Sequence, residues 1–356
     1  MAFLRHTLQP PRFEASVAAI HRLFTRKSGV VDFLSNLGSV QGLQVGTTAS
    51  APIPFNSGAD CEAYLQSGQS LSARFCFPLE PQAVTISVQT MSRSRYLLAR
   101  DVPDERDLIY SLDRHQLRGP LPQRVDLRAG CPRVLNQGTR LGTCTAHAVA
   151  AAFSYEERRQ MNRVISPSPL FIYYNERALT HQGRNCIHCV LRIRDAIKAV
   201  AKVGVCLESL WPYSEITGRV RKKPPRIAFE TAAKHQVVGY ERIPIGKLKP
   251  AVFLRHLKHC LADRSPILFG FKVYESFETE TVKENGIMPV PDTRREKRKG
   301  GHAVMAVGYD DRRKACLVRN SWGPDWGIKG YFWMPYKVIT NPEIAHDFWT
   351  VRGVTR

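Results

Sequence analysis

The spacing of apolar residues in the first hundred positions predicts one helix, a loop and two strands. Residues 12–27 place apolar side chains three and four positions apart, which is typical of an amphipathic helix with Phe13, Val17, Ile20 and Phe24 on one face. Residues 45–70 are rich in Gly, Ser, Ala and Pro and predict a loop. Apolar and polar residues alternate over 71–77 and 84–88, which predicts strands.

A helical pattern follows in the middle of the chain. The sequence is rich in alanine from Cys144 to Phe153 and then becomes strongly charged at residues 156–159. This pattern predicts a helix that is buried on almost all sides at its start and exposed at its end. A second helix is predicted over residues 192–203 and ends at Gly204.

The pattern changes again at about residue 235. Short apolar runs alternate with turn residues, as in a sheet, at 266–271, 303–308, 316–319 and 330–334. Before the helical part, residues 101–124 hold three prolines and many charges with little periodicity, which predicts an extended linker. A helical half therefore precedes a β-rich half, and the fold class is predicted to be α+β.

Chain length and hydropathy limit the class of protein. A chain of 356 residues is long enough to bury a full core and to hold more than one structural unit. No run approaches about 18 uncharged apolar residues, so no membrane span is predicted. The N-terminus lacks the apolar core of a signal peptide. We therefore expect a cytoplasmic protein.

The net charge of +21 is concentrated in one part of the chain. Residues 123–356 carry 40 of the 52 Lys and Arg residues but 21 of the 31 Asp and Glu residues. An acidic partner, nucleic acid or a plain solvated surface would each suit this excess. Two basic segments, 219–226 and 294–299, are expected in loops, and no nucleic-acid-binding motif accompanies them. The sequence makes no prediction of oligomeric state.

The nine cysteines leave their pairing open. Without a signal peptide, mostly reduced thiols are expected. Cys186 and Cys189 form a Cys-x-x-Cys pair that suits unpaired thiols, a local disulfide, a redox pair or half of a zinc site. No second half-site with suitable spacing follows, so neither a metal site nor a cofactor is predicted.

Three separated residues suggest nucleophilic chemistry. Cys144 begins the predicted alanine-rich helix, where the helix dipole and free N–H groups favour a thiolate. His302 follows two glycines and opens an apolar strand, and Asn320 ends another strand. An asparagine beside a histidine can accept its ring N–H and fix its orientation. Each residue has an ordinary structural explanation alone, so only the three together indicate a nucleophile system.

Together these settings resemble the papain family of cysteine peptidases, which includes the cathepsins. Residues 136–146 resemble the family's nucleophile loop, 301–310 its histidine strand and 319–331 its asparagine strand. The resemblance implies a papain-like two-lobed α+β domain over 123–356. A helical lobe at about 130–235 and a β-rich lobe at about 236–356 would flank the active-site cleft.

Further segments resemble a microbial and large-virus branch of that family. They are residues 103–107 ahead of 125–128, Thr145 after the cysteine in place of tryptophan, Arg194-Asp195, 205–213 and 347–352. If a virus encodes the chain, the resemblance makes packaging in a virion an alternative to the cytoplasm.

The resemblance implies a role for each motif residue. Cys144 would be the nucleophile, paired as a thiolate with an imidazolium His302, and would form a thioester acyl-enzyme on a peptide or protein substrate. Asn320 would orient His302, and Trp322 would shield their hydrogen bond from water. The Gln137 side chain and the Cys144 backbone N–H would form the oxyanion hole.

The residues beside the substrate depart from the family pattern. Leu141 stands where many relatives have a disulfide-bonded cysteine. Val190 and Leu191 fall where the family has paired glycines that run beside the substrate. Gly301 and Ala303 are expected to contribute small walls to the cleft. The shape of the cleft is therefore the least transferable feature.

The N-terminal region and two rival functions stay open. Residues 1–100 match no recognisable inhibitory pattern, and either a pro-region or regulatory segment or an accessory domain would suit them, with residues 101–122 as the linker. A non-proteolytic binding protein with the same fold, or a basic nucleic-acid-binding protein with vestigial chemistry, would be alternatives to a peptidase. The complete set of catalytic residue types favours the peptidase.

Overall fold

The computed structural model describes residues 43–47, 70–75, 84–89, 96–180 and 189–355. The chain divides into two compact units, Met1–Arg93 and Ser94–Arg356. Among the described residues, no helix is both long enough and apolar enough to cross a membrane.

The first unit contains a small antiparallel sheet in the order β1-β2-β3. Its strands are β1 (Leu43–Thr47), β2 (Ser70–Phe75) and β3 (Val84–Gln89). The two strands predicted from alternation are confirmed as β2 and β3. The loop predicted over 45–70 is wrong at both ends, because residues 45–47 pair with β2 and Ser70 begins β2, while residues 48–69 lie outside the described residues. The helix predicted over 12–27 lies outside the described residues.

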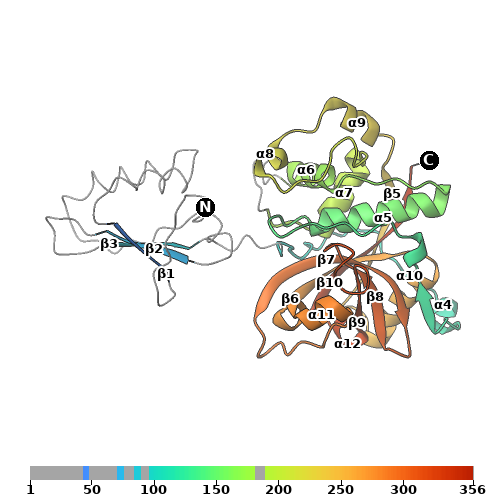
Figure 1. Ribbon diagram of the computed structural model, residues 1–356. Coiled ribbons are helices and arrows are strands. Elements are labelled where there is room, and N and C mark those ends of the chain that lie inside the picture. The colour runs from blue at the N-terminus through green and yellow to red at the C-terminus, as the bar shows by residue number, and fades with distance from the viewer. Residues whose placement is uncertain (1–42, 48–69, 76–83, 90–95, 181–188, 356) are drawn as a thin grey trace. The chain divides into compact units, whose positions relative to one another are not determined.

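The second unit has a helical lobe and a sheet lobe. Figure 1 shows α5 between the sheet and the other helices of the helical lobe. The helical lobe comprises α5 (Cys144–Met161), α6 (Pro169–Leu179), α7 (Ile193–Val203), α8 (Thr217–Arg221) and α9 (Arg226–Ala232). The helices predicted from Cys144 and over 192–203 are confirmed as α5 and α7. Gly204 ends α7 with a φ of +89°, where an added Cβ would lie 1.8 Å from the Ala232 carbonyl oxygen, so only glycine fits.

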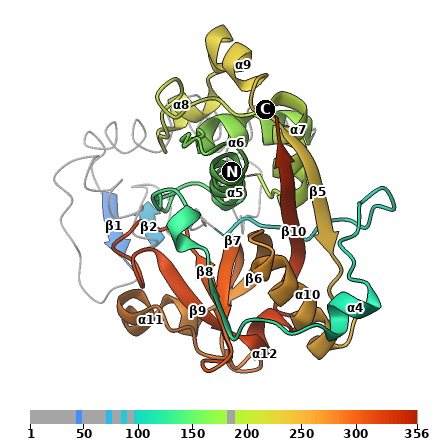
Figure 2. The same ribbon diagram turned by 90° about the vertical axis from the view of Figure 1, so that its right-hand side faces the viewer.

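The sheet lobe is built on an antiparallel sheet in the order β5-β10-β6-β7-β8-β9, with β4 beside β7. Its strands are β4 (Arg124–Asp126), β5 (Val237–Ile243), β6 (Ile267–Tyr274), β7 (Arg298–Asp310), β8 (Ala315–Arg319), β9 (Tyr331–Pro335) and β10 (Ala345–Val354). The four apolar runs predicted as strands are confirmed in β6, β7, β8 and β9. Strands β5 and β10 run side by side between the two lobes (Figure 2).

Further helices lie in segments for which the sequence predicted sheet, loop or linker. They are α4 (Arg114–Arg118), α10 (Pro250–Ala262), α11 (Glu280–Asn285) and α12 (Tyr336–Ile339), with short 3₁₀ turns at Arg128–Gly130 and Glu275–Glu278. The sheet-like pattern predicted after residue 235 is wrong for α10, whose Phe253 and Leu257 repeat at helical spacing. The loops predicted for the basic segments are partly wrong, since these segments enter α8, α9 and β7.

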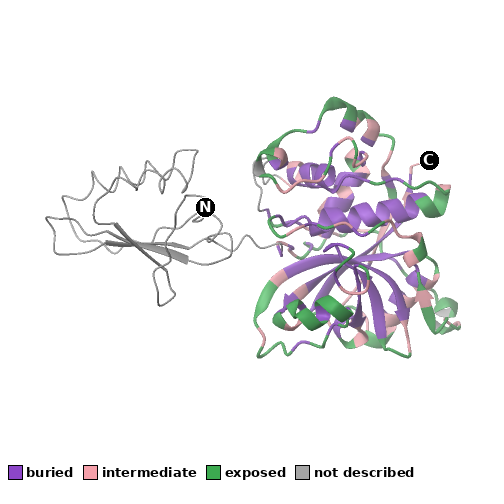
Figure 3. Cartoon of the chain, viewed as in Figure 1, coloured by how far each residue is buried: buried purple, intermediate pink, exposed green. Residues whose placement is uncertain are grey.

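The core lies where α5 and α10 pack on the sheet, and Figure 3 shows α5 and most of the sheet as buried. Alanine predominates in the first turns of α5, which allows that helix to contact β7 and β10 closely. The rings of Phe269 and Phe348 are stacked with centroids 5.0 Å apart, and Phe253 of α10 meets Phe348 edge-on at 4.9 Å. Each such buried ring stabilises the fold by about 1.5–3 kcal/mol. The sheet that carries His302 is therefore held in place by its packing against α5 and α10.

Candidate active site

Cys144 is the first residue of α5 and is 1% exposed. Burial raises the pKa of its thiol to about 12, although the backbone N–H of Ala303 acts in the opposite direction. Loss of solvation therefore acts against the thiolate expected from the helix start. The contact with Ala303 also places Cys144 beside the strand that carries His302.

His302 and Asn320 lie on neighbouring strands, because β7 pairs with β8 and Asn320 directly follows β8. The His302 Nε2 atom lies 2.8 Å from the Asn320 Oδ1 atom, and an amide oxygen only accepts, so Nε2 donates. The backbone N–H of Ser321 donates to the same oxygen at 2.8 Å. The ring of Trp322 stacks on His302 with centroids 5.0 Å apart. The orientation of His302 is therefore fixed by both a hydrogen bond and a ring contact.

Gln137 is fully buried next to the Asn320 strand end. Its backbone N–H donates to the Ser321 carbonyl oxygen at 2.8 Å, and the Ser321 hydroxyl donates to Gln137 Oε1 at 2.6 Å. Because Oε1 accepts that bond, the side-chain NH₂ is the end that can face a substrate oxygen. The structure thus brings all of the predicted chemical residues together, namely Gln137, Cys144, His302, Asn320 and Trp322.

Residues 96–100 cross this site in an extended conformation and are called the strap below. Leu191 lies beside the strap: the Ala99 N–H donates to the Leu191 carbonyl at 2.9 Å, and the Leu191 N–H donates to the Leu97 carbonyl at 3.1 Å. On the other side, the Gly301 N–H donates to the Tyr96 carbonyl at 3.3 Å. Both lobes therefore hold the strap by backbone hydrogen bonds, in the way that extended peptides are bound.

The strap side chains cover the chemical residues. The Tyr96 ring meets His302 edge-on at 6.0 Å, and the Tyr96 hydroxyl donates to Glu278. A Cβ added to Gly142, two residues before Cys144, would lie 2.7 Å from the Leu97 Cβ. The strap therefore lies against the His302 ring and against the loop that leads to Cys144.

Leu98 fills a recess in the sheet lobe. A Cβ on Gly270 would lie 2.6 Å from the Leu98 Cδ2 and 2.6 Å from the His346 Cε1, and a Cβ on Gly301 would lie 2.6 Å from the Leu98 carbonyl oxygen. Glycines at these positions make room for the strap.

Of the residues predicted to line the cleft, some lie against the strap or Cys144 and one is exposed. Gly301 and Leu191 contact the strap directly, and Ala303 is buried next to Cys144. Val190 is 45% exposed. The strap residues were not predicted as site residues; the only sequence signal was an apolar pair, Leu97-Leu98, ahead of a charged stretch.

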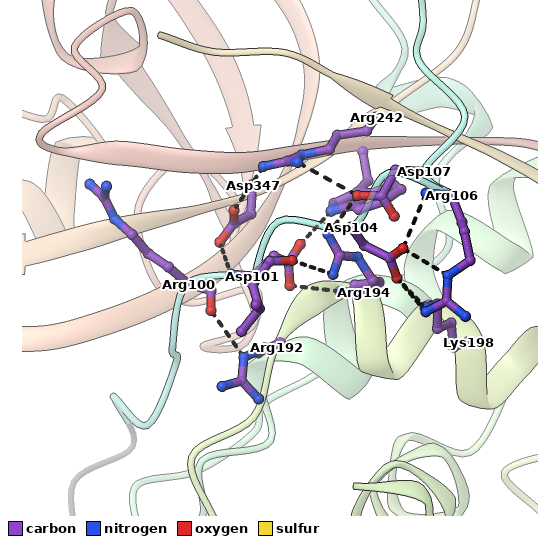
Figure 4. Close-up of polar contacts among 12 residues, drawn as sticks. Arg100, Asp101, Asp104, Arg106, Asp107, Arg192, Arg194, Lys198, Arg242 and Asp347 are labelled. Carbon is purple, nitrogen blue, oxygen red and sulfur yellow. Dashed lines mark hydrogen bonds and ion pairs between the residues drawn. The ribbon is translucent and has the colours of Figure 1, made fainter.

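Asp101 follows the strap and is anchored in the sheet lobe (Figure 4). Its carboxylate accepts from Trp349 Nε1 at 2.7 Å and from the Arg194 backbone N–H at 3.3 Å. Its own N–H donates to Asp347 Oδ2 at 2.8 Å, and that oxygen is also 2.8 Å from His346 Nδ1. Burial, followed by the charge of Asp347, raises the pKa of Asp101 to about 7. The end of the strap is therefore held by a carboxyl group that takes up a proton at a higher pH than an ordinary aspartate does.

Ion pairs, one of them buried, extend this anchor along residues 101–107 (Figure 4). Arg194 Nη2 lies 2.5 Å from Asp107 Oδ2, and both side chains are almost fully buried. Arg242 of β5 lies 3.5 Å from the same Asp107 oxygen, and Lys198 of α7 pairs with Asp104 at 3.4 Å. The stretch predicted as a linker thus packs against α7 and β5. Two of its acidic residues, Asp104 and Asp107, are paired with cations of these elements.

The cysteines and basic segments contribute little to this site. Cys189 is disulfide-bonded, and Cys186 lies outside the described residues. Five free thiols occur among the described cysteines: Cys131, Cys144, Cys206, Cys260 and Cys316. In the basic segments, Arg219 stacks on the Trp211 ring at 3.8 Å and Lys223 lies over Phe229 at 5.9 Å. These two cations therefore pack locally, and a nucleic-acid partner stays a prediction.

Comparison with known proteins agrees with this geometry. The family described as papain family cysteine protease matches residues 121–351. An uncharacterized peptidase C1-like protein of Acanthamoeba polyphaga mimivirus is 39% identical over 287 residues, which cover 76% of this chain and 90% of that protein. Cathepsin B-like CP3 of Giardia intestinalis is 29% identical over 209 residues, which cover 56% of this chain and 63% of that protein.

Solved structures share the fold. Xylellain, a cysteine protease from Xylella fastidiosa, is 37% identical with a TM-score of 0.65 and covers 74% of this chain and 98% of its own. The digestive procathepsin L 3 of Tenebrio molitor, at 17% identity and a TM-score of 0.55, covers 98% of this chain and 95% of its own and shows likeness of fold alone. The predicted α+β, two-lobed papain-like fold is confirmed, and the chain belongs to the papain family of cysteine proteases.

Proposed function

We propose that this cysteine protease cleaves peptide bonds with Cys144 as nucleophile and His302 as its proton partner. The observation that carries the proposal is the 2.8 Å bond from His302 Nε2 to Asn320 Oδ1 beneath the Trp322 ring. With Nε2 committed to Asn320, Nδ1 is the ring nitrogen that exchanges a proton with the thiol. Asn320 thus selects the tautomer that the reaction requires.

The reaction proceeds through a thioester. His302 Nδ1 takes the proton of the thiol as the Cys144 sulfur bonds to the scissile carbonyl carbon, whose oxygen takes the negative charge beside the Gln137 amide and the Cys144 N–H. The carbon–nitrogen bond breaks as His302 delivers its proton to the leaving amine. His302 then takes a proton from water, the hydroxide attacks the thioester, and the carboxylic acid product leaves as the thiol is restored.

Covalent labelling tests this assignment. A peptide epoxide is expected to label Cys144 and to abolish hydrolysis of a fluorogenic peptide library. Cys144→Ala should neither label nor turn over peptide, and Asn320→Ala should retain labelling with slower turnover. Equal hydrolysis by wild type and Cys144→Ala would refute the role of Cys144.

We propose further that the N-terminal region regulates the enzyme through the strap. The support is the position of residues 96–100 across the chemical residues, with Leu98 buried in the sheet lobe. A substrate needs the same space, so turnover requires the strap to move. Deleting residues 1–100, which keeps Asp101, should increase the initial rate of peptide hydrolysis. An unchanged rate would favour a plain accessory role for this region.

A further inference from the structure

The loop from Gln137 to Cys144 carries both groups of the proposed oxyanion hole. Such a hole lowers the barrier only if its donors are held about 2.7–3.1 Å from the developing oxyanion before the reaction begins. The loop contains Gly138 at a φ of +70° and Gly142, so its own sequence does little to fix its shape. Contacts from outside the loop must therefore hold its two ends in register.

One hydroxyl group joins those two ends. The Tyr213 Oη atom lies 2.7 Å from the Gln137 carbonyl oxygen and 2.8 Å from the Thr143 Oγ1 atom. A carbonyl oxygen only accepts, so the tyrosine donates to Gln137 and accepts from the Thr143 hydroxyl. Tyr213 therefore bridges the residue with the side-chain donor and the residue immediately before Cys144.

Tyr213 is itself held in place by neighbouring groups. Its backbone N–H donates to Glu208 at 2.6 Å, and its ring meets the His147 ring edge-on with centroids 4.7 Å apart. Burial lowers the pKa of His147 to about 4, so the ring is neutral at pH 7, and its Nδ1 donates to the Thr143 carbonyl at 2.9 Å. The position of Tyr213 is thus fixed by the hydrogen bond of its backbone N–H and by the contact of its ring with His147.

A second residue of the same segment holds the middle of the loop. Glu215 Oε1 accepts the Arg140 backbone N–H at 2.6 Å. The Glu215 carboxylate also lies so close to Gly138 that an added Cβ would be 1.9 Å from it. Tyr213 and Glu215 therefore contact the loop at its ends and at its centre.

We propose that Tyr213 is a positioning residue for the oxyanion hole, acting through Gln137 and Thr143. The inference rests on the proposed function, since it assigns the Gln137 amide and the Cys144 N–H to the oxyanion. The hydroxyl does not touch substrate. Its loss should impair the step in which charge develops on oxygen, while binding of the uncharged peptide and alkylation of the thiol should be preserved.

Tyr213→Phe removes this bridge and keeps the ring. Tyr174→Phe is a matched control, because the Tyr174 hydroxyl is also buried but has no hydrogen-bond partner among the described residues. We expect kcat for a fluorogenic peptide to fall about tenfold in Tyr213→Phe, the scale of one or two lost hydrogen bonds. KM should change less than about twofold, as expected for an interaction that matters mainly in the transition state.

Two thiol reagents separate positioning of the oxyanion hole from damage to the nucleophile. A peptide aldehyde adds to the Cys144 sulfur, and its carbonyl oxygen takes the charge and enters the oxyanion hole. Iodoacetamide alkylates the same sulfur with loss of iodide and forms no oxyanion. Tyr213→Phe should weaken aldehyde inhibition about tenfold and leave the alkylation rate unchanged.

The outcomes are distinct. If Tyr213→Phe matches Tyr174→Phe in kcat and in aldehyde inhibition while wild type is active, the inference is wrong and the proposed function stands. An equal loss of aldehyde inhibition and alkylation also overturns it. If wild type itself neither hydrolyses peptide nor labels at Cys144, the proposed function fails instead. Should Tyr213→Phe fail to fold, Thr143→Val removes one of the two bonds and must reproduce the loss of kcat and of aldehyde inhibition.

Discussion

Truncating Leu98 should expose the thiol of Cys144. Leu98 is 7% exposed and fills the recess beside Gly270 and His346. Burying a leucine side chain contributes about 1.5–3 kcal/mol, so Leu98→Ala should weaken docking of the strap by about 2 kcal/mol. Each 1.36 kcal/mol is a factor of ten, and the open fraction should therefore increase about 30-fold.

The assay is the rate at which iodoacetamide alkylates Cys144 in the full chain, measured by mass spectrometry. When the strap opens and closes faster than the reagent reacts, this rate follows the open fraction, and Leu98→Ala should label about 30-fold faster than wild type. Leu127→Ala is the matched control, because Leu127 is 8% exposed and lies outside the strap. Equal labelling of Leu98→Ala and wild type, or equal acceleration by Leu127→Ala, would refute occlusion by the strap.

Three further predictions concern the strap and its anchor. Docking of the strap raises the pKa of Asp101 from its ordinary 3.8 to about 7, so the docked state binds a proton more tightly than the open state. Docking is therefore strongest below pH 3.8 and weakens as the pH rises through 7. The Cys144 labelling rate of wild type divided by that of Asp101→Asn should therefore rise between pH 3.8 and 7. A ratio that does not change with pH would contradict this prediction. Gly301→Ala places a methyl group against the Leu98 carbonyl, 2.6 Å away, and should increase labelling at constant pH. Arg194→Met leaves the buried Asp107 carboxylate with only Arg242, 3.5 Å away, so chemical denaturation should show a loss of about 3 kcal/mol, the low end for a broken buried ion pair; a loss below about 1 kcal/mol would contradict it.

The elements that carry the chemistry could be predicted because their signals are local. Cys144 begins a run of alanines that forms a buried helix, and His302 and Asn320 lie in apolar runs that form paired strands. These patterns depend on neighbours in the sequence, so the fold and the candidate site follow from them. The roles assigned to these residues remain predictions.

The strap and its anchor could not be predicted because their burial depends on distant partners. Leu98 is covered by Gly270 and Gly301, and Asp101 is paired with Trp349, all far along the chain. A charged stretch without periodicity gives no sign that its charges will find buried partners. The degree of burial of the Cys144 thiol could not be predicted either, and because this burial acts against the thiolate, the thiolate stays a prediction.

The most direct test of the central claim is an active-site titration of the full chain. A peptide epoxide is added in increments, and residual hydrolysis of a fluorogenic peptide is measured beside the amount of probe bound. The proposed mechanism predicts that activity falls linearly to zero as one equivalent of probe attaches to Cys144. Activity that persists at full labelling of Cys144, or in Cys144→Ala, would contradict it.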